Sequence, residues 1–505
     1  MNYFCFNCQS DAGAAAFKLP SNTKIVIASA PTPVRGGAGM ARGKRWLKGA
    51  QMSALTCFKS YDIRGKLGVE LNEDIAYRIA AACAEVRSPK TVVLGCDSRA
   101  SSPGLKAALV RGFTDMGVDV LDIGMCGTEE VYFATTHLGA DLGIEVTASH
   151  NPIDYNGMKV VGPGSRPLDP TTEMEAIRLR AEAGAFTPHV RKGEVKSVDP
   201  RADFASRVLS FVNTPSLKPL KIIVNAGNGT AGPTFDAIHE QLKSTQAPLE
   251  FVTMDHNPDS DFPNGIPNPL LSENQPRTAA AVRAHSADFG VAWDGDFDRC
   301  FFFDQNGQFV DGYYIVGLLA RQAIAANPGA SIIHDPRLVW DTREIVAEAG
   351  GVAVQSRVGH AFIKRVMRET NAVYGGEMSA HHYFRDFMYC DSGMIPWLLI
   401  AELVSTTGTP LGDLVKARQA RFPASGEINF TIADPAKALL TVEATLAGEA
   451  IEISYADGLS MDFGQWRLSL RRSGTEPLVR LNIESRGDAA LVRQQLSRVK
   501  SLLME

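Results

Sequence analysis

The sequence predicts an α/β protein made of three similar αβα sandwich modules with mixed sheets, followed by a smaller C-terminal α+β domain. The length of 505 residues corresponds to three or four domains of about 150 residues each. Short, nearly continuous apolar runs alternate with segments of helical period, which is typical of sheets covered by helices on both faces. This pattern occurs three times and then changes near residue 423.

Each module contains three apolar runs, each of which ends in a loop rich in Gly, Asp or Ser. The nine runs begin at Thr91, Val118 and Leu142, at Leu220, Leu249 and Asp288, and at Ser331, Gly351 and Asn371. Ligands of such sheets bind at the carboxyl ends of the strands. We therefore expect functional groups in the loop after each third run, which is the most polar one. The predicted domains cover residues 52–203, 204–307, 308–422 and 423–505.

The C-terminal domain differs from the modules in the order of its elements. From Gly426 the sequence predicts a strand, a helix, and strands around residues 451–455, 466–470 and 478–483. The last helix follows a predicted N-cap, Asp488, because its apolar residues recur at helical spacing. These residues are Val492, Leu496, Val499 and Leu503.

Residues 1–51 are predicted to be a disordered extension, because they are rich in Ala, Gly, Pro and basic residues and show no sustained periodicity. They hold seven Lys or Arg residues against one acid, a balance of +6, so the other 454 residues carry −11. The segment that begins at Met52 has the pattern of the start of a folded domain, so residues 1–51 are interpreted as upstream sequence from a misplaced start codon. The composition of residues 1–51 also resembles a transit peptide. The CxxC pair of Cys5 and Cys8 is only half of a zinc site.

The composition excludes several classes of protein. Hydrophobic residues make up 45% and charged residues 21% of the chain, as in soluble globular proteins. The longest apolar run, residues 394–404, is interrupted by Pro396 and Glu402 and is shorter than the roughly 20 residues of a transmembrane helix. A net charge of −5 argues against nucleic-acid binding. Eight cysteines, mostly in apolar stretches, are interpreted as reduced thiols of a cytoplasmic protein.

The loop DGDFDR places Asp294, Asp296 and Asp298 within five residues. So much negative charge in one loop indicates a shared cation. An EF-hand is excluded, because Arg299 and Gln305 stand where that loop has Gly and Glu. Carboxylates at the end of a strand suit Mg²⁺. The alternative is a solvated acidic turn that caps a helix.

Ser149 and His150 lie in the loop TASHNP, which follows the third run of the first module. A serine before Asn-Pro is commonly only a turn or a helix cap. Near a metal ion, however, its hydroxyl becomes a candidate acceptor and donor of a phosphoryl group. The usual signature of serine hydrolases, GxSxG, is absent from this loop.

Two further loops carry groups that bind sugars and phosphates. GEMSAHH offers short acceptors and donors, namely Gly376, Glu377, Ser379 and His381. RRSGTEP offers a guanidinium, hydroxyls and backbone amides, from Arg471, Ser473, Gly474 and Thr475. The alternatives are a polar strand end for the first loop and an exposed basic turn for the second.

A dinucleotide-binding motif is a competing interpretation of the second module. Gly227, Gly229 and Gly232 form GxGxxG after a strand, and Asp255 ends the next strand. The corresponding first strands of the other modules end in GCDSR and HDPR, without these glycines. A tight turn between strand and helix is therefore favoured over a nicotinamide nucleotide site.

In this order and at these spacings, TASHNP, DGDFDR, GEMSAHH and RRSGTEP resemble the four signature loops of the α-D-phosphohexomutases. The segments LTCFKSYDIRGKLG, DIGMCGTEEVYFAT and YGGEMSAHHYFRDFMYCDSGMIPWLL are most similar to the bacterial phosphomannomutases of capsule and lipopolysaccharide pathways. The resemblance covers residues 53–505. Met378 fits the mannose and glucose branch of the family.

The resemblance implies a role for each loop. Ser149 would carry the phosphoryl group, and the three aspartates would bind Mg²⁺ together with its phosphate. Arg299 would steady the group in transfer. Gly376, Glu377 and Ser379 would belong to the loop that holds sugar hydroxyls, and the RRSGTEP residues would hold the phosphate that is not transferred. Residues that would complete the site, with Lys159 and the histidines as candidate acids and bases, are Tyr61, Arg64, Lys159, His360 and His381.

The implied reaction interconverts mannose 6-phosphate and mannose 1-phosphate through a phosphoserine and a hexose 1,6-bisphosphate, which also serves as activator, and feeds GDP-mannose synthesis. A phosphoglucomutase or a dual-specificity mutase is the nearest alternative. An Mg²⁺-dependent sugar phosphatase with an aspartate nucleophile, a NAD-binding protein and a non-catalytic sensor are alternatives of other classes. The expected partners are small hexose phosphates, without nucleic acid or membrane, and the expected state is a monomer or homodimer.

Overall fold

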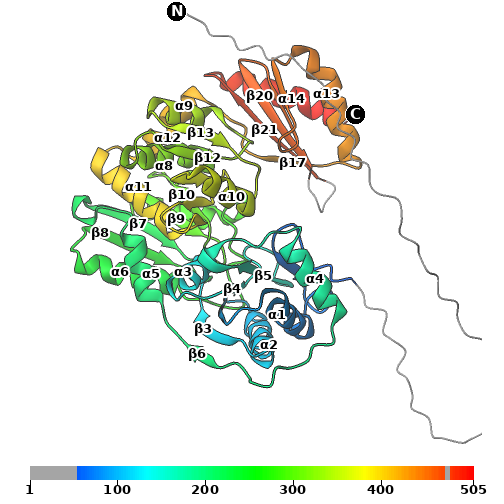
Figure 1. The fold of residues 1–505 in the computed structure, drawn as a ribbon. Coiled ribbons are helices and arrows are strands. Elements are labelled where there is room, and N and C mark those ends of the chain that lie inside the picture. The colour runs from blue at the N-terminus through cyan, green and yellow to red at the C-terminus, as the bar shows by residue number, and fades with distance from the viewer. Residues whose placement is uncertain (1–53, 473–477, 505) are drawn as a thin grey trace, which may run out of the picture. The chain divides into compact units, whose positions relative to one another are not determined.

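The structure is a computed structural model that describes residues 54–472 and 478–504. The predicted extension of residues 1–51, with its Cys5–Cys8 pair, lies outside the described residues. Four sheets follow one another along the chain, three mixed and one antiparallel (Figure 1). Each of the nine apolar runs of the modules forms a strand. The predicted fold class, with three αβα modules and a C-terminal α+β domain, is thus confirmed.

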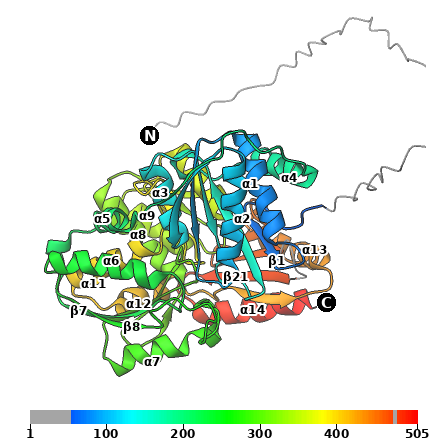
Figure 2. The ribbon, with the colours of Figure 1, turned by 90° about the horizontal axis from the view of Figure 1, so that it is seen from below.

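The first sheet has the strand order β1-β5-β4-β2-β3-β6, in which β4, β2, β3 and β6 are parallel and β1 and β5 antiparallel to their neighbours. Its strands are β1 (Ile63–Lys66), β2 (Thr91–Cys96), β3 (Asp119–Met125), β4 (Leu142–Val146), β5 (Tyr155–Val161) and β6 (Val195–Ser197). Its helices are α1 (Glu73–Arg87), α2 (Ser102–Asp115), α3 (Thr128–His137) and α4 (Glu173–Ala183). Helices α1 and α2 lie side by side (Figure 2).

The second sheet has the order β11-β10-β9-β7-β8, with β7 parallel to both β8 and β9. Its strands are β7 (Leu220–Asn225), β8 (Leu249–Met254), β9 (Phe289–Trp293), β10 (Cys300–Phe303) and β11 (Phe309–Val310). The associated helices are α5 (Arg201–Leu209), α6 (Ala231–Ser244) and α7 (Pro276–Ala284). All five residues of β9 are buried, which explains its uninterrupted apolar sequence.

The third sheet has the order β13-β12-β14-β15-β16. Its strands are β12 (Ser331–His334), β13 (Val352–Gln355), β14 (Tyr374–Gly376), β15 (His382–Phe384) and β16 (Cys390–Asp391). Its helices are α8 (Gly312–Ala326), α9 (Trp340–Glu348), α10 (His360–Thr370), α11 (Met394–Thr407) and α12 (Leu411–Arg421). The longest apolar run of the sequence forms α11, and Pro396 is tolerated because it lies in the first turn. Among the described residues no helix is long and apolar enough to cross a membrane.

The C-terminal sheet has the order β17-β21-β20-β19-β18, and all its pairs are antiparallel. It consists of β17 (Ile428–Thr431), β18 (Glu452–Ser454), β19 (Leu459–Asp462), β20 (Trp466–Arg472) and β21 (Leu478–Ser485), with α13 (Pro435–Leu446) and α14 (Ala489–Leu503). The side chain of Asp488 caps α14 as predicted. The prediction missed β19, although Asp457-Gly458 just before it is a common hairpin turn and Gly458 has φ +83°.

The packing joins the second and third modules more closely than the C-terminal domain. One apolar core includes Trp293 of the second module and Trp397 of the third, whereas the C-terminal domain has a core of its own. The C-terminal domain meets the third module through the buried Glu484, which accepts hydrogen bonds from the hydroxyl of Tyr313 and the amide of Val339. Polar contacts therefore hold the C-terminal domain against the third module, whereas an apolar core joins the second and third modules.

Glu129 connects the first module to the third. This fully buried residue of α3 accepts hydrogen bonds from the amides of Gly393 and Met394, at 2.9 and 3.0 Å, at the start of α11. Burial raises the pKa of its carboxyl group well above the usual value. The first amides of a helix have no partner within it, so Glu129, together with the Ser392 hydroxyl, supplies acceptors at the start of α11.

We expect Glu129→Ala to lower the melting temperature by roughly 4–8 °C, because the buried amide of Gly393 loses its acceptor at a cost of about 2 kcal/mol, whereas that of Met394 keeps Ser392 Oγ. Differential scanning calorimetry measures this. Glu240→Ala is the matched control, since Glu240 is exposed and its carboxylate forms an ion pair with the exposed Lys243, and it should change the free energy of unfolding by less than about 0.5 kcal/mol. Equal melting temperatures for the two variants would contradict the assignment.

Candidate active site

Ser149 lies in the loop after β4, and its hydroxyl faces the second module. The side chain is buried, and its Oγ donates a hydrogen bond to Asp294 Oδ2 at 2.6 Å. His150 Nδ1 lies 2.9 Å from Ser149 Oγ. Burial, Arg299 and Arg64 hold the pKa of His150 well below its usual value, so this imidazole is neutral. The structure therefore brings the predicted serine and the predicted aspartate loop into direct contact.

Asp294, Asp296 and Asp298 follow β9 and are at most 3% exposed. This burial is inconsistent with a solvated acidic turn. Oxygens of the three carboxylates lie within 4.8 Å of one another, and the Oδ1 atom of each has no hydrogen-bond partner among the described residues. Burial and the charges of Asp298 and Asp296 raise the pKa of Asp294 to about 7. Convergent, unpaired carboxylate oxygens are the ligands that Mg²⁺ prefers, so the residues fit this ion.

Lys159 on β5 supplies a positive charge to the aspartates. Its Nζ donates to Asp296 Oδ2 at 2.7 Å and to Asp298 Oδ2 at 2.5 Å. Burial alone would lower the pKa of Lys159, but the two carboxylates raise it above the usual value, so the amine stays protonated. Thr128, the first residue of α3, donates from Oγ1 to Asp296 Oδ2 at 2.7 Å. Sequence reasoning missed Thr128, because nothing in the sequence shows that the start of α3 lies beside the aspartate loop of the second module.

Arg299 and His381 join the aspartate loop to the third module. Arg299 Nε lies 3.6 Å from Asp294 Oδ2 and donates to His381 Nε2 at 3.2 Å. Because Nε2 accepts this bond, the other nitrogen of a neutral ring carries the proton. That nitrogen, Nδ1, lies 3.1 Å from Glu377 Oε2. The three residues thus form a continuous polar chain from the second module to the third.

Glu377 follows β14 and is 1% exposed. It accepts hydrogen bonds from the Tyr383 hydroxyl at 2.6 Å and the Gly359 amide at 3.1 Å. Burial would raise the pKa of Glu377, but His381 and Arg337 hold it well below its usual value. The Ser379 hydroxyl lies 3.4 Å from Arg337 Nη2. Arg337 was not predicted, since HDPR carries no recognisable motif.

Gly376 has a packing role in the structure. It ends β14, and a Cβ atom there would lie 2.6 Å from Val316 and 2.8 Å from the Tyr374 hydroxyl. Any larger residue would displace the core beneath the loop that carries Glu377. The residue therefore contributes to the position of this loop.

Tyr61, Arg64 and His360 lie around the same region. The Tyr61 ring packs edge-on against His360 with centroids 5.5 Å apart. Burial and Glu377 raise the pKa of Tyr61, whereas Arg471 of the C-terminal domain lowers it. Burial and Lys364 lower the pKa of His360 to about 3. Arg64 donates to Asn151 in the serine loop at 2.7 Å.

Arg471 is the one predicted phosphate-binding residue of RRSGTEP that the structure describes. It is the last residue but one of β20, and its Nε lies 3.1 Å from Asp457 Oδ2. Ser473, Gly474 and Thr475 lie outside the described residues. The predicted phosphate loop is thus located by its first residue only.

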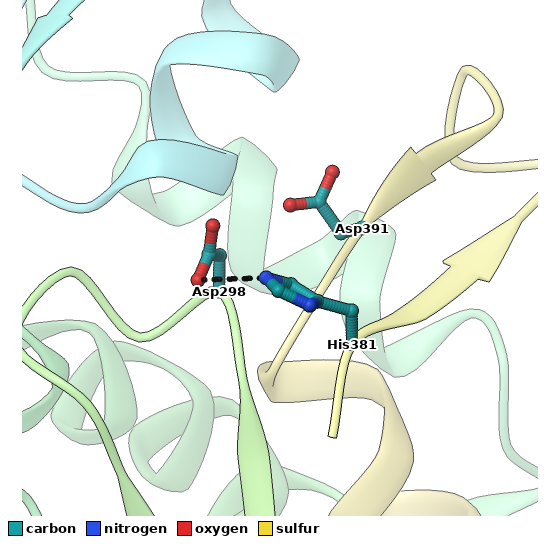
Figure 3. A group of neighbouring side chains, drawn as sticks. All are labelled: Asp298, His381 and Asp391. Carbon is teal, nitrogen blue, oxygen red and sulfur yellow. Dashed lines mark ion pairs between the residues drawn. The ribbon is translucent and has the colours of Figure 1, made fainter. Parts of the chain in front are cut away.

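A second acidic cluster lies next to the three aspartates. Figure 3 shows His381 near Asp298 and Asp391, and the three offer ligand atoms within 4.8 Å of one another. Protein cations already neutralise this group, because Lys364 pairs with Asp391 and Lys159 with Asp298. The cluster shares Asp298 and the Lys159 charge with the aspartate triad, and Lys364 adds a second cation beside Asp391, so it forms a charge-balanced extension of the triad.

The GxGxxG glycines of the second module pack against the protein's own loops. A Cβ at Gly229 would lie 2.6 Å from the Gly295 carbonyl oxygen, inside the aspartate loop. A Cβ at Gly232 would lie 1.9 Å from the His256 carbonyl oxygen. Asp255, the predicted ribose ligand, is held by Arg277 at 2.6 Å. The motif therefore serves a tight turn that supports the aspartate loop, which favours the simpler of its two interpretations.

Comparisons with known proteins agree with this geometry. Family models described as phosphoglucomutase/phosphomannomutase alpha/beta/alpha domains I, II and III match residues 56–187, 202–307 and 311–422, and the C-terminal domain of the same family matches residues 427–501.

The chain is similar to a phosphomannomutase of Salmonella montevideo, with 58% identity over 90% of this chain and 100% of the relative. It is 54% identical to the phosphohexose mutases of Xanthomonas campestris pv. campestris, over 89% of this chain and 99% of the relative. A crystal structure of a phosphoglucomutase/phosphomannomutase family protein from Burkholderia thailandensis shares 31% identity and a TM-score of 0.77, covering 89% of this chain and 97% of that one. The chain belongs to the phosphoglucomutase/phosphomannomutase family.

Proposed function

We propose that the chain is a phosphomannomutase that interconverts mannose 6-phosphate and mannose 1-phosphate through a phosphorylated Ser149. The observation that carries this proposal is the contact between Ser149 Oγ and Asp294, 2.6 Å, beside three carboxylates with unpaired oxygens. The similarity to relatives named phosphomannomutase supports the choice of substrate.

The aspartate triad would hold Mg²⁺, with Asp294, Asp296 and Asp298 as ligands. The ion, when bound, would withdraw charge from the phosphoryl oxygens. Lys159 stays protonated between two of these carboxylates, so it adds a fixed positive charge at the same point. Arg299, 3.6 Å from Asp294, supplies a second one. These cations favour the pentavalent, charge-rich arrangement of phosphoryl transfer.

Phosphoryl transfer to the substrate breaks the bond between phosphorus and Ser149 Oγ and forms a bond to a sugar hydroxyl oxygen. The proton of that hydroxyl must leave to a base, and the departing Ser149 Oγ must take up a proton in the same step; in the return transfer Ser149 Oγ loses this proton as it attacks phosphorus. His360 and His381 are the proposed proton carriers. The pKa of His360 is lowered to about 3, so its ring is neutral at physiological pH and could hold a transferred proton only transiently. Lys159, which is protonated, is suited to stabilise charge or to donate.

The remaining residues would bind the substrate in both of its orientations. Glu377 and Ser379 would hold sugar hydroxyls, and Arg471 with Ser473, Gly474 and Thr475 would hold the phosphate that is not transferred. Tyr61 and Arg64 would lie against the substrate between these groups. A hexose 1,6-bisphosphate that turns between two transfers would account for the reaction, and the same compound would serve as activator. Exclusion of water would protect the phosphoserine from hydrolysis.

Ser149→Ala is expected to lower turnover of mannose 1-phosphate by about 10³-fold or more, because it removes the hydroxyl that is proposed to carry the phosphoryl group. A coupled assay with a trace of bisphosphate measures turnover. Ser206→Ala, in which an exposed serine of α5 loses the same atom, is the control and should keep wild-type activity. Normal turnover in Ser149→Ala together with phosphate release would support a phosphatase with an aspartate nucleophile instead.

Mg²⁺ is expected to raise the melting temperature of the wild-type protein by about 3 °C or more, because it binds the folded state. In Asp294→Asn this increase should vanish, while the metal-free variant should melt no lower than the wild type, since one of three repelling charges is gone. Differential scanning fluorimetry with and without MgCl2 measures both. Asp236→Asn, on the exposed face of α6, should respond as the wild type does. An undiminished response of Asp294→Asn would argue against the triad as the metal site.

Mannose 1-phosphate is expected to be converted with a higher kcat/KM than glucose 1-phosphate. The relative named phosphohexose mutases, 54% identical to the chain, favours dual specificity as the second candidate, so turnover of both sugars is expected. Parallel coupled assays with equal concentrations of the two substrates decide. Conversion of glucose 1-phosphate alone would assign the chain to phosphoglucose chemistry.

A further inference from the structure

Arg99 holds the loop that carries Ser149. It lies in GCDSR just beyond β2 and is 1% exposed. Its Nη2 donates to the carbonyl oxygens of Ser149 at 2.9 Å and Asn151 at 2.5 Å. Its Nη1 donates to those of Pro152 at 2.9 Å and Tyr155 at 3.3 Å. One guanidinium thus satisfies three backbone acceptors of a single irregular loop and a fourth at the start of β5.

The loop needs such a support, because its backbone is strained at the reactive residue. Ser149 has φ +51°, in the left-handed region that a residue with a side chain seldom adopts. Such a conformation persists only where the surroundings enforce it. On the other side of the loop, a Cβ at Gly295 would lie 2.7 Å from the Ser149 carbonyl oxygen. Arg99 and the aspartate loop therefore hold the backbone of Ser149 from two directions.

Arg99 is itself held rigidly. Its Nε lies 3.4 Å from Asp97 Oδ2, and its amide donates to Asp97 Oδ1 at 3.0 Å. Ser102, the first residue of α2, donates to the same Oδ1 atom at 2.5 Å. The guanidinium also lies over the Phe262 ring of the second module, 5.9 Å from its centroid. Because Asp97 holds the Nε end of this planar guanidinium, its Nη1 and Nη2 atoms can set the position of the carbonyl oxygens that they bind.

We propose that Arg99 is a positioning residue, which fixes the backbone of residues 149–155 so that Ser149 Oγ stays in line with Asp294 during phosphoryl transfer. The inference rests on the proposed function of Ser149. Arg99 has no contact with the Ser149 hydroxyl in the structure, so it acts through the backbone. Removing it should therefore impair the transfer step and leave the groups that bind sugar and phosphate in place.

Arg99→Lys keeps the charge but replaces the fork with a single ammonium, which cannot reach four carbonyl oxygens. We expect kcat to fall by about 10²-fold, as for a reactive group displaced by about 1 Å, with KM within about threefold of the wild type. Hydrogen exchange measured by mass spectrometry should be faster in peptides covering residues 147–157. This readout does not depend on turnover.

Arg78→Lys is the matched control. Arg78 lies in the same module and also binds backbone carbonyl oxygens, those of Ala181 and Glu182, but it does not contact the serine loop. It should keep kcat, and its exchange should change near residue 181. If Arg99→Lys keeps kcat, or if both variants lose kcat and melting temperature alike, the positioning role is wrong.

Asp97→Asn is the second variant in case Arg99→Lys does not fold. It removes the charge that anchors Arg99 Nε while leaving the four carbonyl contacts possible, and we expect kcat to fall about tenfold with faster exchange in the same peptides. Unchanged kcat and exchange would refute the proposal. Ser149→Ala distinguishes failure of the proposed function from failure of the positioning role. If that variant is fully active, the proposed function fails. An inactive Ser149→Ala with a fully active Arg99→Lys refutes the positioning role alone.

Discussion

The burial of three carboxylates at the end of β9 is the constraint on which the rest of the site depends. Asp294, Asp296 and Asp298 are almost inaccessible to water, and like charges so close together are unfavourable without cations. Two cations of the protein pair with these carboxylates: Lys159 from the first module and Arg299 from the aspartate loop itself. Three Oδ1 atoms remain unpaired among the described residues. A divalent cation would complete this balance, which ties metal binding to the association of the modules.

The same constraint explains why groups from three modules converge on this loop. Ser149, Lys159 and Thr128 all come from the first module and all contact the aspartate loop of the second. His381 and Glu377 extend the network into the third. Buried polar groups require partners, so displacing any one module would leave several charged groups of the others unpaired. The apolar core shared by the second and third modules fixes the frame within which these contacts form.

Charge is distributed unevenly along the chain, and also between the whole protein and the site. The whole chain carries −5, and residues 52–505 carry −11, whereas the cationic side chains Arg64, Lys159, Arg299, Arg337 and Arg471 gather around the serine and sugar loops. An acidic protein that takes anionic sugar phosphates needs such local concentration, because the field of the nearest charges outweighs the net charge at short range. The buried guanidinium of Arg99 differs from these cations, since its donors bind backbone carbonyl oxygens of the protein.

The sequence by itself determined the fold class, the nine module strands and the residues with unusual chemistry, because these follow from local apolar period and from composition at strand ends. It missed β19 of the C-terminal domain and, in the modules, β1, β5, β6, β10, β11, β15 and β16. It also missed Thr128, Arg337 and Arg99, whose residue types are ordinary. Their importance depends on what lies opposite them: Thr128 meets Asp296 across 168 positions of the chain. Only the tertiary structure decided which charges pair and which oxygens stay open, because Coulomb and hydrogen-bond energies depend on distances in space that local sequence does not encode.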